Sequence, residues 1–241
     1  MLLSQKFFPK RLRSSKMKIS ILTLFPEMFS GPFDHSIVKN AKEKKLIEIN
    51  FVNIRDFGIG RHQVVDDKSY GGGHGMILRV DVLEKAISQT KIKSLSKDEQ
   101  KVILLSPHGK TFNQKKALEL ANLKHLILVC GHYEGVDERV KEFIDEELSI
   151  GDFIVTGGEI PAMLVTDAIT RLIKGVLKEG VTSAESFSEF LEYPQYTKPN
   201  TYNDLSVPSV LLSGNHGEIK SWRDKTSLKT TTKLRPDLLR R

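Results

Sequence analysis

The sequence has little cysteine and no long apolar run. Cys130 is the only cysteine among 241 residues, so an intrachain disulfide is excluded and a reducing cytoplasm is the simplest setting. With no second thiol and with histidines scattered along the chain, a structural zinc site is not expected. No apolar run approaches the ~20 residues that a membrane-spanning helix needs. These absences predict a cytoplasmic protein without a membrane partner.

Two nucleotide-binding fingerprints are also missing. Gly109-Lys110-Thr111 resembles the end of a phosphate-binding loop, but Leu104 stands where that motif needs its first glycine. The stretch LTLFPEMF, which follows the first predicted strand, lacks the G-x-G-x-x-G turn of dinucleotide-binding folds. These absences argue against a P-loop NTPase and against a methyltransferase of the common Rossmann type.

The charge balance is basic. The formal net charge is +7, and the hydrophobic fraction of 39% is ordinary for a globular protein. The excess of cations favours an anionic partner, nucleic acid first, although a generally basic protein remains the alternative. Residues 1–16 are basic, contain no acid, and are expected to be a disordered extension ahead of a start at Met17.

The hydrophobic pattern predicts alternating strands and helices. Buried strands are expected at 18–24, 47–54, 102–105, 125–130 and 150–155. Helices are expected at 34–46 with Asp34 as its cap, at 80–90, at 113–121, from 137, from 159 and at 221–229. This order predicts an α/β fold with a mostly parallel sheet. Ligands bind such sheets beyond the carboxyl ends of strands, here after Leu105, Cys130 and Val155.

Two glycine-rich segments are candidate functional loops. Gly157-Gly158 precedes a helix with Pro161 in its first turn, an arrangement that can offer backbone N–H groups to a ligand. A tight turn that only packs the helix on the sheet is the alternative. The loop at 55–75 contains six glycines and clustered charges, which favours a functional loop.

Six motifs occur together in one order: LFPEMF, VDDKSYGGGHGM, LLSPHG (with a turn expected at 106–109), LVCGHYEGVDER, SIGDFIVTGGEIPAM and FLEYPQYTKP. As a set, from Met17 to the C-terminus, they resemble the bacterial tRNA (guanine-N1)-methyltransferases of the SPOUT superfamily. The resemblance implies a SPOUT-type parallel sheet with a deep trefoil knot and a small helical C-terminal domain. It divides the chain into a catalytic domain at 17–177, a flexible linker at 178–186 and a tRNA-binding domain at 187–241.

The resemblance also implies the reaction and the partners. The family transfers a methyl group from S-adenosylmethionine to N1 of the guanosine at position 37 of tRNA, next to the anticodon. The expected partners are therefore the tRNA anticodon stem-loop and a second copy of the chain, because the family is an obligate homodimer. Mg²⁺ is an expected cofactor, and a hydrated ion held by one or two carboxylates leaves no clear sequence signature. Another SPOUT RNA methyltransferase and a catalytically weakened RNA-binding homologue remain alternatives.

By position, the resemblance assigns the methyl-donor pocket to three loops and the start of the helix that follows them. Its residues are Leu105, Ser106, Pro107, Gly109, Gly131, Tyr133, Glu134, Ile150, Gly151, Asp152, Phe153, Ile154, Val155, Gly157, Gly158 and Pro161. Leu105, Ile150 and Phe153 are expected to form the walls of an apolar slot for adenine.

Two residues are assigned to catalysis. Arg171 matches the arginine that stabilises charge on guanine O6, although a simple i,i+4 pair with Asp167 is the alternative. Glu185 matches the general base, with Glu189 as the fallback. Here the sequence departs from the family, since glutamate replaces aspartate and the segment is one residue shorter. His132 also replaces an arginine. Phosphate contacts are expected from Arg55, Arg61, Lys68 and the C-terminal helix.

Overall fold

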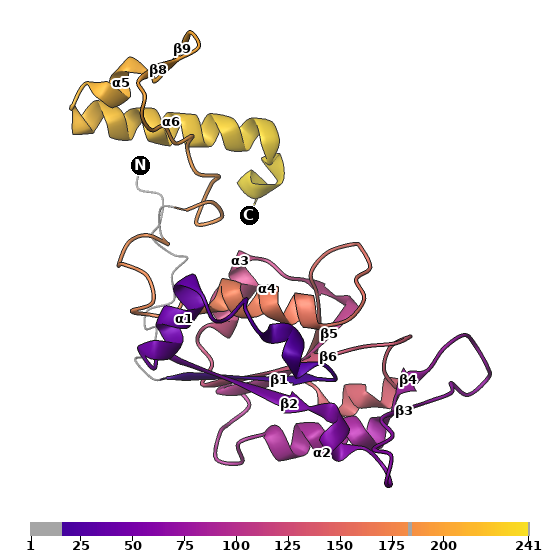
Figure 1. The fold of residues 1–241 in the computed structure, drawn as a ribbon. Coiled ribbons are helices and arrows are strands. Elements are labelled where there is room, and N and C mark those ends of the chain that lie inside the picture. Colours follow the sequence, from indigo (N-terminus) through magenta and orange to yellow (C-terminus); the bar gives the residue numbers. More distant parts are fainter. Residues whose placement is uncertain (1–15, 183–184, 241) are drawn as a thin grey trace. The chain divides into compact units, whose positions relative to one another are not determined.

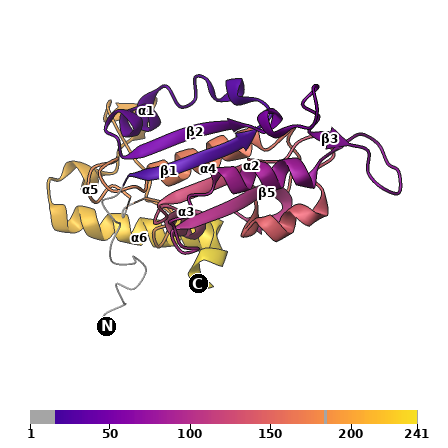
Figure 2. The ribbon, with the colours of Figure 1, turned by 90° about the horizontal axis from the view of Figure 1, so that it is seen from below.

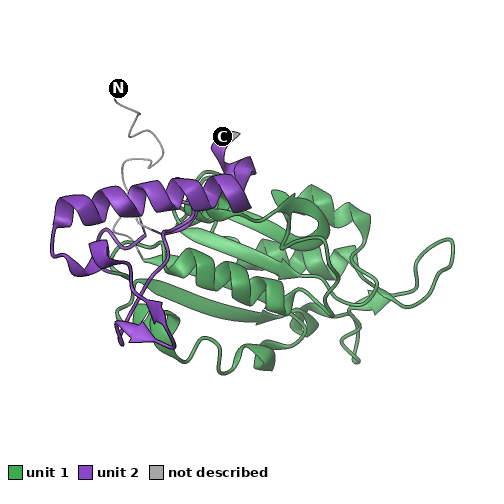
Figure 3. Ribbon diagram, turned by 90° about the horizontal axis from the view of Figure 1, so that it is seen from above, with its two compact units in different colours: residues 1–177 green, residues 178–241 purple. Residues whose placement is uncertain are grey.

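A computed structural model describes residues 16–182 and 185–240 of the chain. Residues 1–15 of the expected N-terminal extension lie outside this part. The chain forms two compact units, residues 1–177 and residues 178–241, which Figure 3 colours separately.

The first unit is built on a five-stranded parallel sheet with strand order β2-β1-β6-β5-β7. The strands are β1 (Met17–Thr23), β2 (Ile47–Asn53), β5 (Gln100–Thr111), β6 (His125–Cys130) and β7 (Glu146–Ser149). The central strand β6 is buried at every residue, as expected for a strand covered on both faces. The predicted α/β fold with a parallel sheet is therefore confirmed.

Helices cover both faces of the sheet (Figures 1 and 2). One face packs against α1 (Ser36–Glu43), α3 (Gln114–Leu120) and α4 (Glu159–Thr170). The other face packs against α2 (Val80–Thr90) and the 3₁₀ helix η3 (Glu138–Phe143). Alternate residues of β6 divide between the two cores, Leu126 and Leu128 on one side and Ile127 and Val129 on the other. This is the period of two that a fully buried strand requires.

The prediction of a strand at 150–155 is wrong. The strand lies earlier, as β7, and residues 150–155 form a loop. Ser149 turns the chain here, because its hydroxyl donates to the carbonyl of Gly151 and accepts from the Gly151 N–H, both at 3.1 Å. Hydropathy did not predict β7, because its sequence contains two glutamates. In the structure, Glu146 pairs with Lys116 at 2.7 Å and Glu147 pairs with Lys141 at 3.2 Å.

Strand β5 continues well beyond the predicted 102–105. Leu105 and Lys110 both pair with Leu148 of β7, so residues 106–109 bulge out of the ladder. The predicted turn at 106–109 is therefore present, as a bulge within a longer strand.

Both ends of α1, and the type of the helix predicted from 137, differ from prediction. Asp34 does not cap α1: its carboxylate accepts from the Gly31 N–H at 3.1 Å, and His35 occupies the cap position. The helix ends at Glu43, before Lys45 adopts a left-handed φ of 57°. The segment from 137 forms a 3₁₀ helix, in which the Asp137 carboxylate accepts from the Arg139 N–H at 3.0 Å.

One histidine is built into the core of the first unit. His125 is fully buried, with Nε2 2.9 Å from the Ser20 hydroxyl and Nδ1 2.8 Å from Gln100 Oε1. Gln100 Oε1 also accepts from the Ile92 N–H, so the histidine donates through Nδ1. Burial lowers the pKa of His125 to about 4, because the charged ring would lose its hydration.

The second unit is organised on one long helix. It contains the hairpin β8 (Thr201–Tyr202) and β9 (Leu205–Ser206), followed by α5 (Ser209–Leu212), α6 (His216–Leu234) and the 3₁₀ helix η4 (Pro236–Arg240). Helix α6 exceeds the predicted 221–229 because Asn215 caps it, accepting from the N–H groups of Gly217 and Glu218. The segment before the hairpin is tied to α6, since the Leu191 N–H donates to Thr231 Oγ1 at 2.9 Å.

Candidate active site

A cavity of about 390 Å³ lies beside the bulge of β5 and the carboxyl ends of β6 and β7. All of the predicted donor-pocket residues except Gly109 and Asp152 line it: Leu105, Ser106, Pro107, Gly131, Tyr133, Glu134, Ile150, Gly151, Phe153, Ile154, Val155, Gly157, Gly158 and Pro161. Three loops separated in the sequence thus form one site, at the sheet edge where parallel folds bind ligands.

The two exceptions, Gly109 and Asp152, lie outside the cavity for different reasons. Gly109 packs against β7, where an added Cβ would lie 2.3 Å from the backbone nitrogen of Leu148. A glycine is therefore required at this position because β5 and β7 pack closely there. Asp152 is exposed, at the outer side of the loop that follows β7.

The predicted apolar walls face the same cavity. Leu105, Ile150 and Phe153 all line it. Phe153 is 57% exposed, and its ring lies against Gly151, where an added Cβ would come within 2.7 Å of the ring. Gly151 also has a φ of +145°, so both the backbone and the ring require glycine here. The slot therefore has a flat, exposed aromatic wall.

The Gly157-Gly158 turn joins two of the loops. The Gly158 N–H donates to the carbonyl of Gly131 at 2.8 Å. An added Cβ on Gly158 would lie 2.5 Å from the Cα of Cys130. Helix α4 begins at the next residue, Glu159, whose buried carboxylate accepts from the Thr23 hydroxyl at 2.7 Å. The turn therefore fixes the start of α4 against the end of β6.

The glycine-rich loop reaches the cavity at its C-terminal end. Figure 1 shows the segment between β3 (Asp66–Asp67) and β4 (Ile77–Leu78) projecting away from the sheet. At the base of this segment, the Glu134 N–H donates to the carbonyl of Met76, and the Leu78 N–H donates to the carbonyl of Gly135, both at 3.0 Å. The outer part is open, and Tyr70 is 99% exposed.

Sequence reasoning missed a charged group on the cavity wall. Glu138, Lys141 and Glu147 all line the cavity. The ammonium of Lys141 lies 2.7 Å from a Glu138 oxygen and 3.2 Å from a Glu147 oxygen, and these two carboxylates, Glu138 first, raise the pKa of Lys141. The sequence signal was present, because Glu138 follows directly on the HYEGVD run.

The histidine that replaces the family's arginine also lines the cavity. Nδ1 of His132 accepts from the Tyr133 N–H at 2.8 Å, and its ring centroid lies 4.9 Å from that of Phe25. The ring is thus held in place by neighbours, with Tyr133 at a left-handed φ of 58°.

The two predicted catalytic residues do not line the cavity. Arg171 caps the C-terminal end of α4, about 15 Å along the helix axis from Pro161 at 1.5 Å per residue. Glu185 belongs to the second unit, where its carbonyl accepts from the Ser188 hydroxyl at 2.7 Å. Within one chain, the donor cavity and Arg171 are therefore at opposite ends of α4.

The outer face of α4 is partly apolar. Ile160 and Leu164 are 49% and 46% exposed, and with Asp167 and Arg171 they follow the three- and four-residue spacing of one helix face. Ile154, in the neighbouring loop, is 84% exposed.

Comparison with known proteins decides the family. Residues 17–241 match the family described as tRNA (Guanine-1)-methyltransferase TrmD. The chain belongs to this methyltransferase family. Proteins named tRNA (guanine-N(1)-)-methyltransferase include one from Syntrophomonas wolfei, 56% identical over 225 residues, or 92% of this chain and 90% of the relative. The one from Carboxydothermus hydrogenoformans is 55% identical over 227 residues, which cover 93% of this chain and 88% of the relative.

Membership in the tRNA (guanine-1)-methyltransferase family confirms the resemblance drawn from the six motifs. It implies S-adenosylmethionine as the methyl donor. The trefoil knot of the SPOUT fold stays a prediction from the family. In the described residues, no helix is long and apolar enough to cross a membrane, and no three His, Cys, Asp or Glu side chains gather as a metal site.

Proposed function

We propose that this chain methylates N1 of the guanosine at position 37 of tRNA, with S-adenosylmethionine as methyl donor, in the cytoplasm. The observation that carries the proposal is the convergence of the donor-pocket residues, drawn from three separate loops, on a single cavity. Residues 17–177 are the catalytic domain, 178–186 the linker and 187–241 the tRNA-binding domain.

The cavity suits the donor by its chemistry. Leu105, Ile150 and Phe153 provide apolar surface for the adenine ring. Gly131 lines the cavity, and a Cβ there would meet no protein atom closer than 3.5 Å, so its backbone can be approached closely by a ligand. Three carboxylates, of Glu134, Glu138 and Glu147, outnumber the single ammonium of Lys141 in the lining, and the excess negative charge complements the positive sulfonium and ammonium groups. S-adenosylmethionine supplies an electrophilic methyl group when it is bound.

The acceptor needs help from a base and a cation. Guanine N1 carries a proton in neutral guanine, so it is a poor nucleophile until the proton leaves. Glu185 accepts this proton, and the guanidinium of Arg171 stabilises the negative charge that develops on O6. Glutamate keeps the carboxylate of the family's aspartate and is one methylene longer, so its carboxylate sits differently relative to the backbone.

A second copy of the chain completes the site. Arg171 is remote from the cavity of its own chain along α4, whereas Ile160 and Leu164 leave an apolar face on the same helix. Two-fold packing through this face would bury that surface in both copies. It would also bring the C-terminal end of one α4 toward the cavity of the other chain. The homodimer is thus part of the catalytic proposal.

The remaining contacts follow from charge. Arg61 and Lys68 are exposed and Arg55 is half-buried in the first unit, and they are proposed to contact tRNA phosphates together with the cations of α6. Mg²⁺ would be held by one or two carboxylates together with oxygens of the substrate.

Methyl transfer to two tRNA transcripts tests the function. The transcripts differ only at position 37, which is guanosine in one and adenosine in the other. Transfer from labelled S-adenosylmethionine to the first alone is expected. Transfer to both would indicate another target nucleoside. Donor binding without transfer to either would indicate an RNA-binding homologue that has lost activity.

A further inference from the structure

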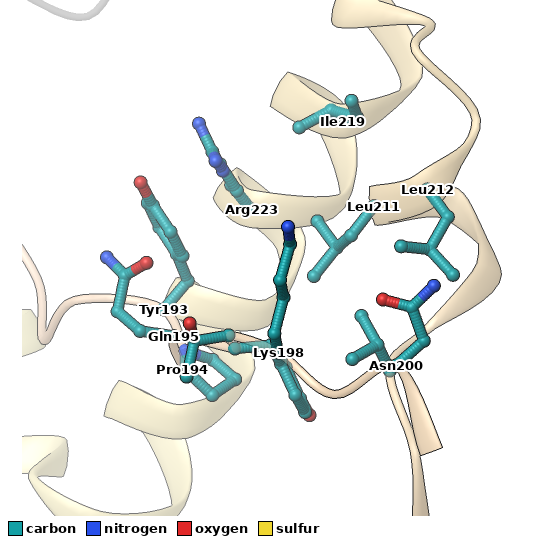
Figure 4. Close-up of a pocket in the computed structure, with 12 residues that line it drawn as sticks. Tyr193, Pro194, Gln195, Lys198, Asn200, Leu211, Leu212, Ile219 and Arg223 are labelled. Atoms are coloured by element: carbon teal, nitrogen blue, oxygen red, sulfur yellow. The ribbon is translucent and has the colours of Figure 1, made fainter.

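The C-terminal unit contains its own cavity, of about 300 Å³. Three segments form it: the extended chain before the hairpin, the short helix α5 with Val207 just before it, and the first half of α6. The residues that line it are Tyr193, Pro194, Gln195, Tyr196, Thr197, Lys198, Asn200, Val207, Leu211, Leu212, Ile219 and Arg223. Figure 4 shows Lys198 rising between Tyr193 on one side and Leu211 on the other, toward the helix that carries Arg223.

Aromatic rings and aliphatic side chains share this cavity. The guanidinium carbon of Arg223 lies 4.7 Å from the ring centroid of Tyr193. The ring of Tyr196 is 48% exposed, and its centroid lies 6.4 Å from that of Trp222. Leu211, Leu212 and Ile219 supply apolar surface, and Leu211 and Leu212 lie across the cavity from Tyr193 (Figure 4). Such a site can receive a flat ring by stacking.

The charge of the cavity is positive and not compensated. None of the described residues that line it is acidic. Within the part of the chain that the structure describes, neither Lys198 nor Arg223 forms an ion pair. Gln195 is the lining side chain that is already engaged with an acid, because its amide nitrogen donates to Glu192 at 2.6 Å. Two cations in a cavity that also holds the exposed ring of Tyr196 favour a ligand that is both aromatic and anionic.

We propose that this cavity binds a single nucleotide of the tRNA, with the base against Tyr196 and the phosphate between Lys198 and Arg223. The inference rests on the proposed function, which makes tRNA the partner. The volume is at the lower end of the range for ligand pockets, about 300–1,000 Å³, so the cavity suits one nucleotide. That nucleotide must be unpaired, because a base within a duplex cannot offer its face to a ring.

Two pairs of variants test the cavity in the full-length chain. Tyr196→Leu removes the ring but keeps an apolar side chain, and Tyr202→Leu is its control, since Tyr202 is 66% exposed on the hairpin and does not line the cavity. Arg223→Gln removes one charge, and Lys97→Gln removes the same charge from an exposed position of the first unit, between α2 and β5, to which no tRNA contact is assigned. The measurement is the Kd for a fluorescently labelled tRNA transcript at fixed salt.

Tyr196→Leu should weaken tRNA binding about 5- to 150-fold, the range of a lost base–aromatic stack. Arg223→Gln should weaken it at least about fivefold, because a hydrogen bond to a charged phosphate is lost. The controls should weaken it less than about threefold. Equal effects in both members of each pair would overturn the proposal. Trp222, the only tryptophan, provides a second readout, because tRNA should change its emission in the wild type and much less in Tyr196→Leu. Unchanged Trp222 emission in the wild type would also contradict the proposal.

The kinetics separate this inference from the proposed function. If the cavity only holds tRNA, Arg223→Gln should raise KM for tRNA and leave kcat at saturating tRNA unchanged. A chain that binds tRNA through the cavity but does not methylate it would overturn the function alone. A chain that methylates the guanosine transcript, with cavity variants that bind tRNA like their controls, would overturn the cavity alone.

Discussion

Gly158 donates its backbone N–H to the carbonyl of Gly131 at 2.8 Å, which joins the turn before α4 to the end of β6. The two glycines differ in what they tolerate. A Cβ on Gly158 would lie 2.5 Å from the backbone of Cys130, whereas a Cβ on Gly131 meets no atom closer than 3.5 Å. Gly158 is therefore required by packing, and Gly131 is free to carry a side chain into the cavity.

Gly131→Leu should block donor binding without unfolding the chain. The leucine side chain would occupy the cavity that Gly131 lines, so affinity for S-adenosylmethionine should fall more than about tenfold, as measured by isothermal titration calorimetry. The Tm should stay within a few degrees of the wild type. Gly158→Ala is the contrasting variant and should lower the Tm markedly, because its Cβ meets backbone. Normal donor binding by Gly131→Leu would remove the cavity from the mechanism.

Glu185→Gln should remove the base and keep the binding sites. Methyl transfer to the guanosine transcript should fall by about 10²- to 10⁴-fold, the usual contribution of a general base. Donor affinity should not change, since Glu185 does not line the donor cavity. Glu185→Asp is the matched control and should retain activity. If instead Glu189→Gln loses the activity and Glu185→Gln keeps it, the base is Glu189.

The first unit should lose stability in weak acid because of His125. The folded-state pKa is about 4 and the unfolded value about 6.5, so between these values the unfolded chain binds the extra proton. The free energy of unfolding is unaffected by this group above pH 6.5 and decreases as the pH falls toward 4, where the loss reaches about 3 kcal/mol. Urea unfolding at pH 7 and pH 5 measures it. His125→Gln should flatten the pH dependence; an equal slope in that variant would assign the effect to other groups.

Leu164→Glu should dissociate the dimer. The substitution places an unpaired charge on the apolar face of α4, where a buried charge without a partner is strongly unfavourable. Sedimentation should show a dimer for the wild type and a monomer for this variant. Ile59→Glu is the matched control, since Ile59 is 43% exposed in the glycine-rich loop, and it should remain dimeric. A monomeric wild type, or a dimeric Leu164→Glu, would contradict the proposed interface.

Sequence reasoning predicted the elements that have strong local signals. Helix α2 and strand β6 occupy the predicted residues, because the helix has a clear apolar stripe and the strand is continuously apolar. Strand β7 was missed because its glutamates are neutralised by lysines from α3 and η3, contacts that no local pattern contains. The end of α1 was also missed, because the left-handed residue that follows it is Lys45, whereas glycine is the usual residue at such a position.

The donor cavity was predictable only through the family. Hydropathy predicted where the strands end, but it could not predict which of the residues after each strand line a cavity. The Lys141–Glu147 ion pair on the cavity wall joins η3 to β7, so it arises from tertiary packing. The second cavity has the same origin, because Lys198 and Arg223 are 25 positions apart in the chain and line one cavity only when the segment before the hairpin packs on α6.

The most direct test of the account is activity in mixed dimers. Arg171→Ala keeps the donor cavity and loses the cation, whereas Gly131→Leu loses the cavity and keeps the cation. Each variant alone should be nearly inactive. After the two are unfolded and refolded together, one site in each mixed dimer combines an intact cavity with an intact Arg171 from the other chain, so about a quarter of the wild-type rate should return. If the mixture stays as inactive as its components, both residues act within one chain and the shared site is wrong.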